Sequence, residues 1–164
     1  MKRLLIMRHA KSSWKDERLS DHERPLNKRG KRDAPRMGRL LRDLELVPDL
    51  IISSTARRAM DTAAAVAEAS GYDEAIMISR YMYHGDPEAY LEVLAALNEE
   101  PRATMVVGHN PGLEELVEEL LDRYVRLPTA TVVAMDVSAG SWREVTIQSQ
   151  ARLVGIWRPK ELDS

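Results

Sequence analysis

Leu4-Leu5-Ile6-Met7-Arg8-His9-Ala10-Lys11-Ser12 passes from an apolar strand directly into a polar loop. Far downstream, Thr104-Met105-Val106-Val107-Gly108-His109-Asn110 does the same. Each stretch therefore places a histidine where an apolar strand ends. Open α/β sheets present their catalytic groups at the carboxyl ends of the strands. His9 and His109 are expected to meet in one crevice.

A third strand is predicted over Leu50–Ser53, and the turn after it leads into a helix predicted over Arg57–Ser70, which begins with Arg57-Arg58. Cations at the amino end of a helix oppose the helix dipole, so an arginine there suggests a bound anion that offsets the cost. The sequence therefore predicts a phosphate pocket with a nucleophile inside it. Its expected members are Arg8, His9, Arg57 and His109.

The remaining segments alternate between helix and strand patterns. A helix is expected from Asn27 to about Leu44; within it, Pro35 requires either a helix start capped by Asp33 or a kink. Further elements are expected at Ile76–Ile78 (strand), from Asp86-Pro87 through Leu97 (helix), at Met105–Gly108 (strand) and after Gly112 (helix). Thr131–Val137 and Glu144–Gln150 are predicted to form a hairpin at the sheet edge. This order predicts a three-layer α/β/α fold whose central sheet is mostly parallel with antiparallel edge strands.

Composition limits the class of protein. The chain has 164 residues, which predicts one domain over residues 1–164. Its 24 basic and 26 acidic side chains and 44% hydrophobic content favour a soluble globular protein over a nucleic-acid binder. The absence of cysteine excludes disulfides and thiolate chemistry. The apolar run Leu4–Met7 is too short for a signal peptide or a membrane span, so we expect a cytoplasmic protein without a membrane partner.

These residue types suit phosphoryl transfer. A neutral imidazole such as His9 is nucleophilic near pH 7, provided that a hydrogen bond to its other nitrogen sets the tautomer. The guanidinium groups of Arg8 and Arg57 match phosphate geometry, and His109 would add a further donor. Two arginines beside the histidines would repel a metal cation, so neither a metal nor another cofactor is expected.

Four short motifs carry a resemblance to a known family: Arg8-His9-Ala10-Lys11-Ser12, Arg24-Pro25-Leu26, Ser53-Ser54-x-x-Arg57-x-x-x-x-Thr62-Ala63 and Gly108-His109-Asn110-Pro111-Gly112. In this order the chain resembles the histidine phosphatase superfamily, the phosphoglycerate-mutase-like enzymes, and within it the SixA-type phosphohistidine phosphatases. The resemblance covers nearly the whole chain, although Ala10 replaces the glycine of the usual Arg-His-Gly triplet. It implies a phosphorylated His9 as covalent intermediate, with Arg8, Arg57 and His109 around the phosphoryl group.

Other residues are candidates for supporting roles. Lys11, Ser12 and Asn110 are expected to contact the phosphate. The segment Tyr83–Glu88 lies where the superfamily often places an acidic donor, and His84 stands where related sequences tend to have glutamate. His84 and Glu88 are therefore the candidate general acids. Asp86 is better explained as the N-cap of the next helix, and Glu88 also fits a partner for the helix dipole.

The substrate prediction follows from the leaving group. An alkoxide must be protonated as it departs, whereas an imidazole leaves with little help, so a weak acid position favours phosphohistidine on a protein. The expected product is inorganic phosphate. A phosphomonoesterase for a small metabolite or another phosphoprotein, and a catalytically silent phosphate-binding domain, remain the alternatives. The basic run Lys28–Arg32 is expected to be a solvated face rather than a nucleic-acid patch, and Trp14 to clamp its loop to the domain.

Overall fold

The computed structural model describes residues 1–98 and 101–162. One six-stranded sheet forms the middle layer, in the order β3-β2-β4-β1-β5-β6. Its strands are β1 (Lys2–Arg8), β2 (Leu50–Ser54), β3 (Ile76–Ser79), β4 (Ala103–Gly108), β5 (Val132–Val137) and β6 (Ala151–Trp157). The α-helices are α1 (Lys28–Asp43), α2 (Arg57–Ser70), α3 (Pro87–Ala95) and α4 (Gly112–Leu121). Short 3-10 helices lie at η1 (Asp21–Glu23), η2 (Arg80–Met82), η3 (Trp142–Glu144) and η4 (Pro159–Glu161).

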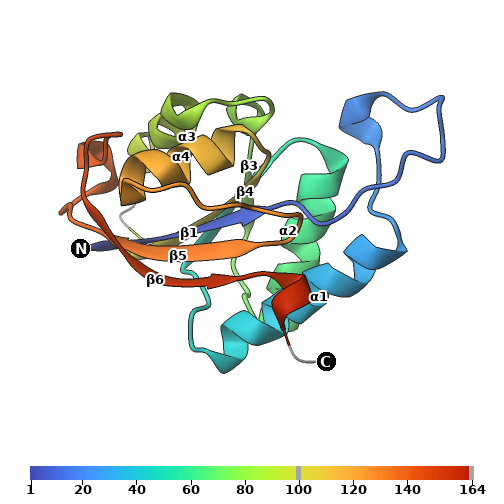
Figure 1. Ribbon diagram of the computed structural model, residues 1–164, viewed down its shortest axis with the longest axis horizontal. Helices are drawn as coiled ribbons and strands as arrows, with labels where there is room; N and C mark the ends of the chain where they lie inside the picture. Colours follow the sequence, from blue (N-terminus) through green and yellow to red (C-terminus); the bar gives the residue numbers. More distant parts are fainter. Residues whose placement is uncertain (99–100, 163–164) are drawn as a thin grey trace.

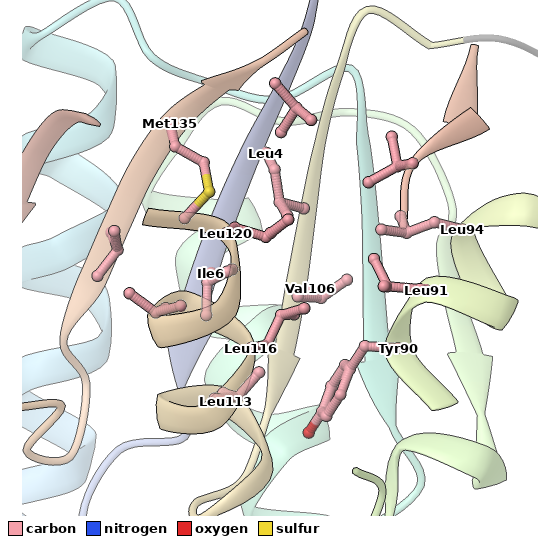
Figure 2. Close-up of a cluster of buried hydrophobic side chains, with 14 of the residues drawn as sticks. Leu4, Ile6, Tyr90, Leu91, Leu94, Val106, Leu113, Leu116, Leu120 and Met135 are labelled. Atoms are coloured by element: carbon pink, nitrogen blue, oxygen red, sulfur yellow. The ribbon is translucent and has the colours of Figure 1, made fainter. Parts of the chain in front are cut away.

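The helices cover both faces of the sheet. In Figure 1, α3 and α4 lie on one side and α1 and α2 on the other. Two buried apolar clusters separate these layers. The cluster under α3 and α4 joins Leu4 and Ile6 of β1 to Tyr90, Leu113 and their neighbours (Figure 2). The alternate β1 residues, Leu5 and Met7, face α1 and α2 on the opposite side. A strand buried on both faces has this continuous apolar sequence, and the predicted three-layer α/β/α fold is confirmed.

The pairing of the central strands positions the site. β1 runs parallel to β4, and β4 runs parallel to β2. β5 is antiparallel to β1, and β6 is antiparallel to β5. Arg8 is opposite Gly108, and the backbone N–H of His9 donates to the carbonyl of Gly108 at 3.0 Å. Because parallel strands end at the same edge of a sheet, this register brings the residues after β1 and β4 together.

Helix α1 resolves the question posed by Pro35. Asn27 is the N-cap, and its side chain accepts a hydrogen bond from the backbone N–H of Gly30. The helix continues through Pro35 to Asp43, so a start capped by Asp33 is wrong. Asp33 is instead buried and forms ion pairs with three arginines of the same helix, Arg29, Arg32 and Arg36.

The predicted second strand of the carboxyl-terminal hairpin is misplaced. Glu144–Gln150 is irregular after η3, and the strand that pairs with β5 is β6, which begins at Ala151. Val145 and Ile147 alternate with polar residues as in a strand, but Val145 is buried in the core from a loop and Ile147 packs against it. Burial of isolated apolar residues in a loop can therefore imitate the alternation of a strand. Helix α3 is also shorter than predicted, since it ends at Ala95.

A helix that crosses a bilayer must be both long and apolar. None of the helices among the described residues meets both conditions.

Candidate active site

His9 follows β1 directly and is buried, with 7% of its surface exposed. Its Nδ1 lies 2.7 Å from the backbone carbonyl oxygen of Ala10. A carbonyl oxygen can only accept, so Nδ1 carries the proton and Nε2 keeps its lone pair. The side chain of Arg58 approaches that Nε2, with its Nε at 3.4 Å. His9 is therefore held in the tautomer that a nitrogen nucleophile needs.

The surroundings of His9 also keep it neutral. Burial, opposed by the hydrogen bond to the Ala10 carbonyl and reinforced by the nearby cations Arg58, Arg8 and Arg24, lowers the pKa of His9 from 6.5 to about 4. Desolvation and positive neighbours both disfavour an imidazolium. At neutral pH Nε2 of His9 therefore carries no proton and accepts the hydrogen bond from Nε of Arg58.

His109 follows β4 and faces His9, as predicted, with the two ring centroids 5.2 Å apart. Its backbone N–H donates to the hydroxyl of Tyr90, and its Nε2 lies 2.8 Å from Oγ of Ser54. Gly108 is required here because a Cβ atom at that position would collide with the Tyr90 hydroxyl. Burial lowers the pKa of His109 to about 3, and His9 and Arg58 lower it as well. His109 is thus placed and kept neutral by buried neighbours.

Of the two arginines that open α2, the structure brings Arg58 into the site and not Arg57. Arg57 is 56% exposed in its side chain and pairs with Asp61 on the surface at 3.6 Å. Arg58 is buried and reaches both His9 and Asp21. The expected position of Arg57 in the pocket is therefore corrected to Arg58. Both residues follow the same strand, but they are a third of a helical turn apart and face different surroundings.

Arg8 lies at the site as expected. Its Nη1 donates to the carbonyl oxygen of Leu127 at 3.0 Å. Its Nε is buried and has no hydrogen-bond partner among the described residues, and the same holds for Nδ1 of His109. A buried donor such as Nε of Arg8 is normally paired, so an oxygen-rich ligand would satisfy it.

Asp21 of η1 holds the cationic side of the site in place. Its carboxylate accepts hydrogen bonds from Arg24 at 2.7 Å, from Arg58 at 3.0 Å and from the Tyr83 hydroxyl at 2.7 Å. Burial raises the pKa of Asp21, but these three hydrogen bonds outweigh it and hold the pKa well below its usual range. Arg24 in turn donates to Oγ of Ser12. Asp21 therefore remains ionised and orients two arginines.

The other candidate residues have different positions. Ser12 is buried beside Arg24, whereas the Lys11 side chain is exposed. Asn110 donates from Nδ2 to the Leu127 carbonyl, and its Oδ1 is buried without a partner in the described part of the chain. His84 stacks on Tyr83 with ring centroids 4.0 Å apart.

Only one of the two candidate acids lines the small cavity, of about 220 Å³, that lies beside His109. His84 lines this cavity, together with Asp86 and Glu115. Glu88 lines a separate depression whose lining includes neither His9 nor His109, and the Asp86 carboxylate caps α3 at the N–H of Ala89. His84 is therefore near the site and Glu88 is not. Among residues 1–98 and 101–162, no group of three or more histidines and carboxylates is arranged to hold a metal ion.

Sequence reasoning missed Arg58, Asp21, Tyr83 and the role of Arg24. For Arg58, the helical spacing of the charged and apolar residues in α2 could have indicated that its side chain faces inward. Arg57 shares a face of α2 with the charged Asp61 and Glu68, whereas Arg58 shares one with Thr62 and other small or apolar residues. Asp21 and Tyr83 offered no comparable signal, because they come from separate loops that only the folded chain brings together.

Comparisons with known proteins agree with this architecture. Residues 4–80 match the profile of the Histidine phosphatase superfamily (branch 1). A solved structure of a candidate phosphohistidine phosphatase SixA from Agrobacterium tumefaciens is 30% identical, with a TM-score of 0.82 over 96% of this chain and 98% of that one. A second candidate SixA structure, from Nakamurella multipartitia, is 26% identical, with a TM-score of 0.83 over 96% of each chain. An uncharacterized chloroplastic protein of Arabidopsis thaliana is 33% identical over 87% of this chain and 70% of its own length.

Proposed function

Because the chain belongs to the histidine phosphatase superfamily, we propose that it is a phosphatase that hydrolyses phosphohistidine on a protein. One observation carries the proposal: His9 presents an unprotonated Nε2 among buried guanidinium groups. Pure phosphate binding would need the cations but would not need a nucleophile of fixed tautomer. The SixA-like neighbours support the phosphohistidine substrate.

The reaction has two steps. In the first, the Nε2 lone pair of His9 attacks phosphorus, the bond between phosphorus and the substrate nitrogen breaks, and that nitrogen takes a proton. In the second, water attacks the phosphorus of phosphorylated His9, the bond between phosphorus and Nε2 breaks, and the water gives up a proton, which releases inorganic phosphate and restores the free Nε2. The Ala10 carbonyl keeps the Nδ1 proton in place and stabilises the positive ring that forms when Nε2 is phosphorylated.

Arg8, Arg58 and His109 would bind the three equatorial oxygens. The buried Nε of Arg8 is a donor that lacks a partner within the described residues, and Arg58 approaches the nucleophile itself. Nδ1 of His109 would be a further donor in the tautomer in which Oγ of Ser54 donates to Nε2. Phosphoryl transfer is accelerated mainly by such fixed donors, because charge spreads over these oxygens in the transition state. A bound phosphate would also offset the cation repulsion that lowers the pKa of both histidines.

The surroundings of the site support a protein substrate. Two segments flank the site, Lys11–Asn27 and Tyr83–Asp86. Both are loops, and the first of them contains the short 3-10 helix η1. A phosphorylated side chain on a protein can enter such a mouth. Asp21 is not suited to protonate an alkoxide, since it is ionised and bound by two arginines. An imidazole leaving group has little need of one. The expected cytoplasmic location is part of the same proposal.

The test is to trap the intermediate. The wild type, mixed with a histidine-phosphorylated protein and stopped with alkaline denaturant, should carry a base-stable, acid-labile phosphate on His9. His9→Ala should carry none and should lose turnover, because the variant lacks the attacking Nε2. His22→Ala is the matched control: that histidine is bound to Oγ1 of Thr55, so phosphorylation should continue.

Substrate comparison separates the alternatives. We expect kcat/KM to be higher for phosphohistidine on a protein than for alkyl phosphates. A preference for alkyl phosphates would favour the metabolite phosphatase. Phosphate binding without any turnover would favour the silent binding domain and would contradict the proposal.

A further inference from the structure

Trp14 is the most exposed large apolar side chain among those described, with 70% of its surface accessible. It lies in the segment between β1 and α1, which extends outward beyond the end of β1 in Figure 1. The sequence predicted that Trp14 clamps its loop to the domain. The exposed ring is instead not buried against the core. A fixed and exposed tryptophan next to an active site requires another explanation.

The ring is held by the site itself. The guanidinium of Arg24 stacks over Trp14, with its central carbon 3.3 Å from the ring centroid. Arg24 is buried and is bound to Ser12, to the Ser13 carbonyl and to Asp21. One face of the indole is thus fixed to a rigid cation, and most of its remaining surface is open to solvent. Rigid aromatic and arginine side chains of this kind dominate the energetics of protein interfaces.

The charges beside Trp14 indicate the chemistry of the partner. Lys11 and Lys15 are both exposed, and neither ammonium group has an acidic partner in the part of the chain that the structure describes. The segment that holds Trp14 therefore carries one flat apolar ring with an exposed lysine at Lys11 and another at Lys15. The acidic Asp16 of this segment is paired with Arg18, and Glu17 lies further along the loop. A polypeptide with apolar and acidic side chains near its phosphorylated residue complements both features.

We propose that Trp14, with Lys11 and Lys15, is the docking surface for the protein that carries the phosphohistidine. This rests on the proposed function and extends it, because it assigns recognition of the polypeptide to residues outside the chemical step. Trp14 sets specificity: it would contact the substrate protein beside the phosphoryl group and would leave the reacting atoms to His9 and the arginines.

The experiment compares two substrates that contain the same bond. One is a phosphohistidine-bearing phosphotransfer domain, and the other is free phosphohistidine. For Trp14→Ala we expect kcat/KM on the phosphotransfer domain to fall about tenfold or more, mainly through KM, as for a truncated interface residue. Turnover of free phosphohistidine should stay within about twofold of the wild type, a change typical of surface substitutions. Trp14→Phe, which keeps a flat ring over Arg24, should retain most of the activity on the phosphotransfer domain.

Met77→Ala is the matched control. Met77 is also an exposed apolar residue, but it lines a cavity with Pro48 and Pro101 at the opposite end of the sheet. The Met77→Ala variant should keep the wild-type kcat/KM for both substrates.

An equal loss on both substrates would overturn the docking role, because it would mean that Trp14 acts only by holding Arg24. No loss on either substrate would also overturn it, while wild-type turnover would leave the proposed function intact. A wild type that cleaves neither form of phosphohistidine would overturn the proposed function and the docking surface together.

Discussion

Arg57 and Arg58 are chemically identical and adjacent, yet the fold gives them different environments. Arg58 donates to Asp21 through two nitrogens and lies against Nε2 of His9, whereas Arg57 pairs with Asp61 in solvent. Exposed ion pairs of this type contribute little to stability. Buried donors at a phosphoryl group contribute most when charge develops in the transition state.

Arg58→Ala is therefore expected to reduce kcat roughly a hundredfold, the loss of about 3 kcal/mol that is common for one such donor. KM should change much less. Arg57→Ala should leave kcat and KM near their wild-type values, because its side chain points away from His9. Steady-state kinetics on free phosphohistidine measure both variants. Equal losses in the two variants would show that the arginine assignment is incorrect.

The two candidate acids also differ in position. His84 lines the cavity beside His109, and Glu88 does not. His84→Ala should slow cleavage of alkyl phosphates more than cleavage of phosphohistidine, because only the alkoxide needs a proton as it leaves. Glu88→Gln should affect neither. The ratio of kcat/KM for the two substrates is the measurement, since it is insensitive to general damage to the fold. An unchanged ratio in His84→Ala would remove His84 from consideration as the acid.

At the scale of elements, α1 and α2 pack through a close contact at Gly38. A Cβ atom on residue 38 would lie 2.7 Å from the carbonyl oxygen of Val66 and 2.8 Å from Cβ of Ala69, both in α2. These are backbone and short side-chain atoms that cannot move aside independently. The glycine thus sets the distance between the helices that cover one face of the sheet.

Gly38→Ala should reduce the free energy of unfolding by about 2 kcal/mol, because the close backbone contacts put the overpacking penalty at the upper end of its usual range, about 3 kcal/mol. The gain in helix propensity, about 1 kcal/mol, only partly offsets this. Urea denaturation followed by circular dichroism gives the value. Gly140→Ala is the control, because a Cβ there would meet only an ordinary contact at 3.7 Å. A Gly38→Ala variant as stable as the wild type would indicate that the helices can separate without cost.

For the whole molecule, two buried neutral histidines link stability to pH. Burial lowers the pKa of His9 to about 4 and that of His109 to about 3, whereas both are near 6.5 in an unfolded chain. Below pH 6.5 the unfolded chain binds protons that the folded protein does not. The free energy of unfolding is therefore greatest above pH 6.5 and falls as the pH drops toward the folded pKa values.

At roughly 1.4 kcal/mol per pH unit, His9 alone should account for about 3 kcal/mol of this loss by pH 4. Denaturant unfolding between pH 7 and pH 4 measures the slope. His9→Asn, whose amide can still donate to the Ala10 carbonyl, should show a flatter dependence, while His22→Asn should follow the wild type. Identical slopes in all three proteins would contradict the linkage. Protonation of carboxylates such as Asp21 belongs to a lower pH range, because its pKa is depressed.

The sequence by itself determined the layers and the meeting of His9 with His109. Apolar runs long enough for buried strands, each followed by a polar loop and an amphipathic helix, admit only an α/β/α arrangement. Parallel strands end at one edge, so His9 and His109 had to be neighbours. These are local patterns and rules of connection, which the linear order of residues contains.

Only the tertiary structure decided which side chains complete the site. The choice between Arg57 and Arg58 depends on the rotation of α2 against the sheet. The roles of Asp21 and Tyr83 depend on two loops, far apart in the sequence, that place a carboxylate and a hydroxyl 2.7 Å from each other. The strand after β5 was displaced to Ala151 because Val145 enters the core from a loop. Such contacts are set by packing between distant segments, and no local pattern of residues encodes them.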